Sequence, residues 1–77
     1  MNEVIVSIRG IPVYVGTLPS GDLKIWHPHN DAVRVIVEPI CRGRGYWRAD
    51  YNNWIVFSRF TSAVLDELCQ QGADHHG

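Results

Sequence analysis

The chain of 77 residues lacks the features that define several classes of protein. No apolar run approaches the roughly 20 residues that a membrane-spanning helix needs. The N-terminus has no basic segment followed by an apolar stretch, as a secretory signal would. We therefore expect no membrane partner and a cytoplasmic location. There is also no linker, repeat or low-complexity stretch, so residues 1–77 are expected to form a single domain.

Cysteine is scarce, and neither sign of charge is in excess. The two cysteines, Cys41 and Cys69, are too few for a disulfide scaffold, although a single bridge between them stays open. Seven lysines and arginines against eight aspartates and glutamates give a net charge of −1. No global field therefore draws the chain to nucleic acid, and an acidic mimic of DNA is excluded. Any affinity for nucleic acid must come from a local patch.

Motifs for catalysis and metal binding are missing. The chain has no P-loop and no G-x-G-x-x-G motif. His27 and His29 flank a proline, and neither they nor the cysteines show the paired spacing of structural zinc sites. No third group orients a Cys–His pair, and so short a chain leaves little volume for a drug-sized pocket. We expect a non-enzyme with no metal and no cofactor.

The N-terminal third predicts strands. Hydrophobic residues make up 45% of the chain and charged residues 19%, which is typical of a globular domain. The β-branched runs 3–8 and 11–16 predict two strands around a tight turn, or one strand with a bulge. Residues 18–22, LPSGD, predict a turn. Residues 23–27 alternate as a half-buried strand does.

Residues 30–38 fit two structures. Their alternating valines favour a strand, yet the same apolar residues also fall on one face of a helix. Asn30 is a suitable N-cap for such a helix. Pro39 should make it stop or kink near Glu38, because proline donates no backbone hydrogen bond. These residues alone leave both alternatives open.

The C-terminal half predicts a hairpin and a helix. Residues 46–57 form two short β-prone runs around a polar turn. The helix that follows can be capped by Ser58 or Thr61 and should end at Gly72. The sequence thus predicts an α+β fold. In it, a small antiparallel sheet, made of the N-terminal strands and the 46–57 hairpin, packs on the C-terminal helix.

Residues 23–68, LKIWHPHNDAVRVIVEPICRGRGYWRADYNNWIVFSRFTSAVLDEL, resemble the HARP domain, a small module that accompanies the motor of DNA-annealing helicases. The matching elements are Leu23 and Ile25, Asn30 to Ile40, Gly45-Tyr46-Trp47, Tyr51 to Asn53, Trp54-Ile55-Val56, and Val64 to Leu68. The resemblance implies a helix at 30–38 and a DNA-binding surface. The chain departs from the family in its extra N-terminal strands, in Pro39, and in having no helicase motor, so annealing activity is not implied.

A basic and aromatic cluster lies in the segment that begins RGRGYWR. Arg42, Arg44 and Arg48 could clamp phosphates, and the interleaved Tyr46 and Trp47 could stack on unpaired bases. We therefore predict a binding module for DNA or RNA with these five residues as its site. Packing of the hairpin tryptophans in the core stays open as another interpretation.

A protein partner is the alternative. Trp26 is expected to face away from the buried side of its strand, and with Tyr51 it would supply the aromatic anchors that interfaces favour. On this hypothesis the chain is a phage or mobile-element protein that inhibits a host nucleoprotein defence complex, as anti-CRISPR proteins do. A homodimer is compatible with both hypotheses.

Overall fold

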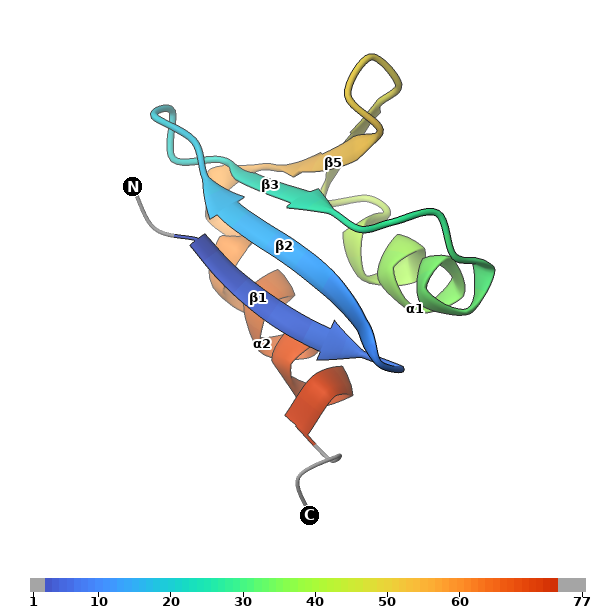
Figure 1. Ribbon diagram of the computed structural model, residues 1–77. Helices are drawn as coiled ribbons and strands as arrows, with labels where there is room; N and C mark the ends of the chain where they lie inside the picture. The colour runs from blue at the N-terminus through green and yellow to red at the C-terminus, as the bar shows by residue number, and fades with distance from the viewer. Residues whose placement is uncertain (1–2, 74–77) are drawn as a thin grey trace.

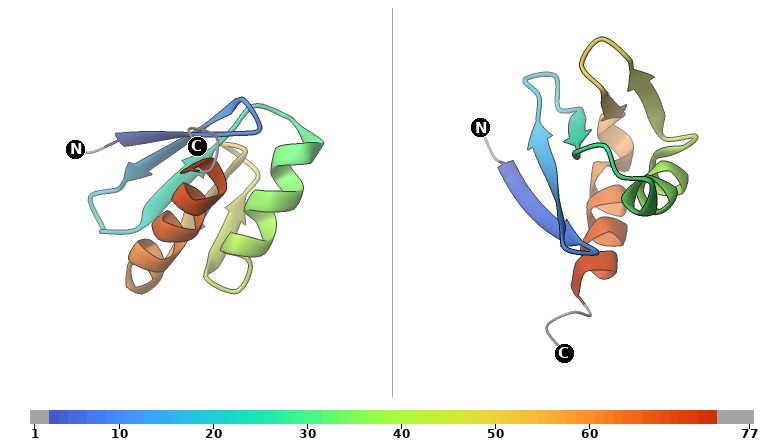
Figure 2. Two further views of the ribbon diagram at one scale, coloured as in Figure 1. Left: turned by 90° about the horizontal axis from the view of Figure 1, so that it is seen from below. Right: turned by 45° about the vertical axis from the view of Figure 1, so that its right-hand side comes forward.

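The computed structural model describes residues 3–73. Over these residues the strands are β1 (Glu3–Ile8), β2 (Ile11–Thr17), β3 (Leu23–Trp26), β4 (Gly45–Arg48) and β5 (Asn53–Val56), and the helices are α1 (Asp31–Cys41), the short 3₁₀-helix η1 (Ser58–Phe60) and α2 (Thr61–Ala73). The strands form one antiparallel sheet in the order β1-β2-β3-β5-β4. The two α-helices lie on one side of it (Figures 1 and 2). The predicted α+β fold, with the sheet against the C-terminal helix, is confirmed.

One face of the sheet forms the core with the helices. Side chains of a strand point alternately to its two faces, so every second residue of β1, β2, β3 and β5 reaches the helices. The core residues are Val6, Ile8, Val13, Val15, Leu23, Ile25, Val33, Val37, Ile40, Cys41, Val56, Val64 and Leu68. This core is almost wholly aliphatic, and Trp54 packs only at its margin. Within the part of the chain that the structure describes, no α-helix covers the other face of the sheet (Figure 1).

The first two strands meet in a tight hairpin, not in a bulged single strand. Ile8 pairs with Ile11, which leaves Arg9 and Gly10 as the two turn residues. Their φ angles are 56° and 78°. Two consecutive left-handed residues are typical of a type I′ turn, whose twist matches that of antiparallel strands.

Residues 31–41 form the helix that the HARP resemblance implied. The Asn30 side chain accepts a hydrogen bond of 3.1 Å from the Val33 N–H and caps the helix. Of the two outcomes expected at Pro39, a stop or a kink near Glu38, the stop does not occur, because α1 continues through Pro39 to Cys41. The hydrogen bond that Pro39 cannot make would reach the carbonyl of Val35. Both residues are exposed, so water can satisfy that carbonyl.

Helix α2 runs through Gly72, contrary to the prediction that this glycine ends it. Gly72 is buried against β1: a Cβ atom there would lie 2.8 Å from the Ser7 carbonyl oxygen and 2.8 Å from Val6 Cγ1. The missing side chain therefore lets helix and strand approach closely. At the other end, Ser58 begins η1, and its N–H donates to Asp22 Oδ1 at 2.9 Å.

The two cysteines are both free, so the bridge that the sequence left open is not formed. Cys41 is buried at the end of α1, whereas Cys69 is exposed on α2. Burial raises the pKa of the Cys41 thiol to about 12, and the positive charge of Arg44 opposes this shift only in part.

This contrast predicts that only one thiol reacts in the folded protein. With an aromatic disulfide reagent at about pH 8, Cys69 should be modified readily, while Cys41 stays protonated and inaccessible. Unfolding in denaturant should release the second thiol. The Cys69→Ser variant is the control and should show no rapid reaction; fast modification of that variant would contradict the burial of Cys41.

Gly45 brings β4 close to β5. It pairs with Val56, and a Cβ atom on it would fall on the carbonyl oxygen of Ile55 and 2.8 Å from the carbonyl carbon of the same residue. These obstacles are backbone atoms, which no rotamer change can move away. Only glycine fits this position without displacing the hairpin.

Gly45→Ala should therefore lower the free energy of unfolding by about 2 kcal/mol or more, because the two strands must separate locally. The matched control is Gly16→Ala, also within a strand, where a Cβ atom would meet side-chain atoms at ordinary distances of 3.8 Å. Urea denaturation of both variants measures the difference. Equal stability of the two would show that β4 does not pass so close to β5.

Candidate nucleic-acid interface

The predicted site residues of the hairpin divide between the two faces of the sheet. Tyr46 pairs with Ile55, and the next residue, Trp47, pairs with Trp54. Neighbours along a strand point in opposite directions, so Trp47 lies on the side of the helices while Tyr46 and Arg48 lie on the open side. Both aromatic rings are substantially exposed, Tyr46 to 44% and Trp47 to 48%. They therefore serve two different surfaces.

The arginine cluster is neutralised by acidic partners. Arg42 Nη2 lies 2.7 Å from Glu38 Oε2. Arg44 Nη1 lies 2.8 Å from Oε2 of Glu67 on α2. The third pair, Arg48 with Asp50, is looser at 3.7 Å. Such partly exposed pairs contribute about 0–1 kcal/mol each, so a phosphate could displace them, but the cluster is not a free basic patch.

The open face of the sheet carries aromatic residues in register across the strands. One row runs from Ile5 of β1 through Tyr14 of β2 to Trp26 of β3. The rings of Tyr14 and Trp26 are tilted by 47° with centroids 5.5 Å apart. Tyr14 is half-buried and Trp26 is 38% exposed. The pair thus presents an aromatic surface on two interior strands of the sheet.

A second row on the same face joins Lys24 of β3, Ile55 of β5 and Tyr46 of β4. Ile55 is buried although it faces away from the helices, and its neighbour Tyr46 contacts Phe57 with ring centroids 5.9 Å apart. Lys24 is exposed and has no acidic partner within ion-pair distance among the described residues. The open face therefore combines stacking surfaces with one unpaired cation.

Asn53 lies at the start of β5 and is the one buried polar residue of the described core region. It alternates with Trp54, so its side chain belongs to the open face, opposite Arg48 in the register. Its Oδ1 atom has no hydrogen-bond partner. A buried acceptor without a partner costs free energy, which marks this position as one that packing alone does not explain.

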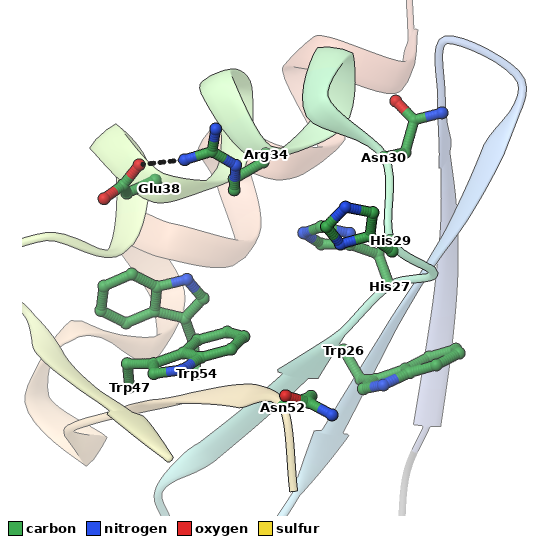
Figure 3. A pocket seen from close by; sticks show the side chains of 9 residues that line it. All are labelled: Trp26, His27, His29, Asn30, Arg34, Glu38, Trp47, Asn52 and Trp54. Atoms are coloured by element: carbon green, nitrogen blue, oxygen red, sulfur yellow. Dashed lines mark ion pairs between the residues drawn. The ribbon is translucent and has the colours of Figure 1, made fainter. Parts of the chain in front are cut away.

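A cleft opens on the other side of the sheet, between α1 and the β4–β5 hairpin (Figure 3). Its volume is about 590 Å³, within the range of small-molecule sites. The expectation that so short a chain leaves little volume for a drug-sized pocket is therefore wrong. The cleft is lined by Trp26, His27, His29, Asn30, Arg34, Glu38, Trp47, Asn52 and Trp54.

Trp26 and Tyr51, the two residues predicted to contact a protein, lie on different parts of the structure. Trp26 stands at the end of β3, on the open face and at the rim of the cleft. Tyr51 lies in the β4–β5 turn, where the Arg48 guanidinium is 4.9 Å from the centre of its ring. Trp26 thus borders both surfaces, whereas Tyr51 belongs to the hairpin tip.

Several residues of these surfaces were not predicted as site residues. Tyr14 could have been found from the strand pattern, because its alternation with buried valines places it on the open face. Glu38 could also have been found as a partner of Arg42, four residues later on a helix. Glu67 gave no such signal, because only the fold brings it to Arg44.

Comparison with family models, curated proteins and solved structures finds no match for this chain. The likeness to the HARP domain therefore stays a prediction drawn from the residues. Among residues 3–73, no cluster of three or more histidine, cysteine or carboxylate side chains is placed to hold a metal ion. No helix in this range is both long enough and apolar enough to span a membrane.

The unpaired acceptor of Asn53 predicts an unusual response to mutation. Asn53→Val removes an unsatisfied buried oxygen and introduces a good strand former, so the free energy of unfolding should stay the same or rise by about 1 kcal/mol. Urea denaturation measures this. A loss of more than about 1 kcal/mol would mean that the amide makes a stabilising hydrogen bond after all.

Proposed function

We propose that the protein is a non-enzymatic binding module that takes single-stranded nucleic acid on the open face of its sheet. The observation that carries this proposal is the uncovered Tyr14–Trp26 pair on β2 and β3. Aromatic side chains on an exposed sheet face stack on unpaired bases, whatever the base, because every base has a flat π-face.

We assign a role in binding to each side chain from its position in the two cross-strand rows of the open face. Tyr14 and Trp26 offer one stacking position, and Tyr46, on the far edge strand of the same face, offers a second. The cations available to the phosphates between them are Lys24, which has no acidic partner among residues 3–73, and Arg48, whose pair with Asp50 is loose at 3.7 Å. Arg42, Arg44 and Trp47 take no part in this site, because the first two are paired with acids and the third lies on the other face.

A single strand fits this face better than a duplex. Within residues 3–73, no α-helix stands on the open face to enter a major groove, and the bases of a duplex are not free to stack on protein. Each phosphate contact to a single strand contributes a slope of about −0.7 to the dependence of log affinity on log salt, so two contacts give about −1.4. The salt dependence should therefore be measurable but shallow.

Titration of dye-labelled oligonucleotides, followed by anisotropy at two salt concentrations, tests this function. The single strand should bind, and the duplex should bind much more weakly. Trp26→Ala should weaken binding by about 1–3 kcal/mol, the value of one base stacked on an aromatic ring. Val35→Ala, which removes an exposed apolar side chain from α1, is the control and should change nothing. Absence of salt-sensitive binding at micromolar protein would refute the proposal.

A protein partner is the second candidate, favoured by the composition of the same face. Ile5, 59% exposed, continues the aromatic row, and Arg48 has its own acid, so the surface resembles an interface core with few free charges. In this case no oligonucleotide binds. Instead the protein should block target-DNA binding by a purified CRISPR interference complex, and Trp26→Ala should not.

A further inference from the structure

The cleft between α1 and the β4–β5 hairpin has the properties of a ligand site, and the function proposed above makes no use of it. It lies on the helix side of the sheet, and of the Tyr14–Trp26 pair only Trp26 reaches its rim (Figure 3). Hydrophobic clefts of this volume in small domains are normally filled by side chains, since interiors pack densely. Here the hairpin tryptophans border open space instead.

An aromatic pair forms one wall of the cleft. Trp47 and Trp54 are directly opposite in the strand register, with ring centroids 5.8 Å apart and an angle of 69° between the rings. An edge-to-face pair leaves ring surface unstacked. Trp54 is anchored at the core, whereas almost half of Trp47 is exposed. The wall therefore offers a flat ring to a planar ligand.

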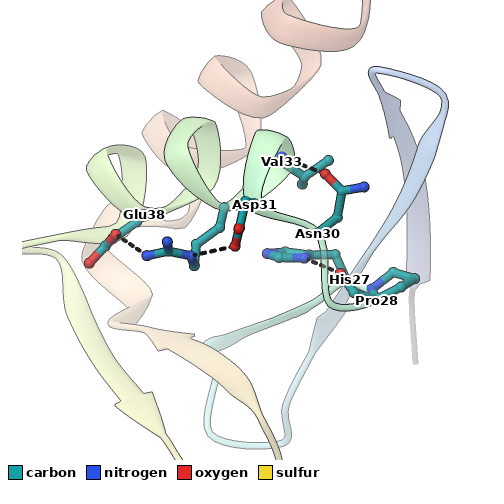
Figure 4. A network of polar contacts seen from close by, with 7 residues as sticks. His27, Pro28, Asn30, Asp31, Val33 and Glu38 are labelled. Atoms are coloured by element: carbon teal, nitrogen blue, oxygen red, sulfur yellow. Dashed lines mark hydrogen bonds and ion pairs between the residues drawn. The ribbon is translucent and has the colours of Figure 1, made fainter.

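On the opposite side of the cleft, a contact between His27 and Pro28 determines which ring nitrogen of His27 can accept a hydrogen bond. His27 Nδ1 lies 2.8 Å from the carbonyl oxygen of Pro28 (Figure 4). A carbonyl oxygen only accepts, so Nδ1 carries the proton and donates it. In the neutral ring Nε2 is then an acceptor. Figure 3 shows the imidazoles of His27 and His29 across the cleft from Trp47 and Trp54.

The charges of the cleft are already matched, which argues against a cationic ligand. Glu38 Oε1 lies 3.6 Å from Arg34 Nη1, and Glu38 Oε2 lies 2.7 Å from Arg42 Nη2. The carboxylate is therefore balanced by two guanidinium groups. Arg34 also lies 3.6 Å from Asp31. A bound ammonium group would find aromatic rings but no free carboxylate. A neutral, flat ligand with a hydrogen-bond donor fits better.

We propose that this cleft binds a single nucleobase. The base stacks on the exposed ring of Trp47, and one of its amino groups donates to His27 Nε2. Adenine, cytosine and guanine all carry such exocyclic amino donors. Asn52, on the rim of the cleft, offers an amide that can pair with a second edge of the base. The base belongs either to a free nucleotide or to an unpaired nucleotide of a strand.

The test follows the indole N–H signals of the three tryptophans by NMR while adenosine or cytidine monophosphate is added. Saturable shifts of Trp47 and Trp54 are expected. Trp47→Ala should weaken binding by about tenfold, as the loss of one stacked base does. His27→Phe, which keeps a ring but removes the acceptor, should weaken it several-fold. Val35→Ala, which shortens an exposed apolar side chain of α1 outside the cleft lining, is the control and should have no effect.

A second arm, with an unlabelled oligonucleotide, separates the sources of the base. Shifts of Trp47 and Trp54 with the oligonucleotide alone would assign the cleft to a strand, whereas shifts with the monophosphates assign it to free nucleotides. If neither probe shifts these two signals, the inference is overturned. The sheet-face function is judged separately, by whether Tyr14→Ala weakens oligonucleotide binding, because Tyr14 contacts Trp26 on the open face and does not line the cleft. Nucleotide binding in the cleft without binding of a strand on the sheet would refute only the sheet-face function.

Discussion

The alternation of side chains along paired strands is the constraint from which both surfaces of this protein arise. Because the two helices lie on one side of the sheet, alternate residues of β1, β2, β3 and β5 face them, and the residues between point to the side without a helix. Tyr46 and Trp47 are adjacent in the chain and yet face different surroundings for this reason. What looks like one basic and aromatic cluster in the sequence is a boundary between two surfaces.

The core is filled without the tryptophans, so their rings remain available to bind a ligand at the surface. Valine, isoleucine and leucine fill the space between sheet and helices, and none of the three tryptophans is fully buried. In a domain of this size, large aromatic residues would be the natural means of increasing the buried apolar area. Their position at the open face and around the cleft instead places stacking surface where a ligand can reach it.

Much of the fold could be predicted from the sequence, because its signals are local. Strand alternation, the polar turns and the hairpin depend on neighbouring residues, and so does the Asn30 cap of α1. The continuation of α1 through Pro39 depends on which side of the helix faces solvent, and the burial of Gly72 depends on β1. The neutralised arginines illustrate the limit for the site: Glu67 reaches Arg44 only after α2 has packed.

The strand order also sets how the chain reaches this structure. The meander of β1, β2 and β3 needs only neighbouring hairpins, which form within microseconds. The pairing of β3 with β5 must instead bring residue 25 against residue 54, across the whole of α1 and β4. Closing that long loop costs entropy before any contact repays it. Trp54 pairs with Ile25 in this step, so it meets the core only when β3 and β5 have come together.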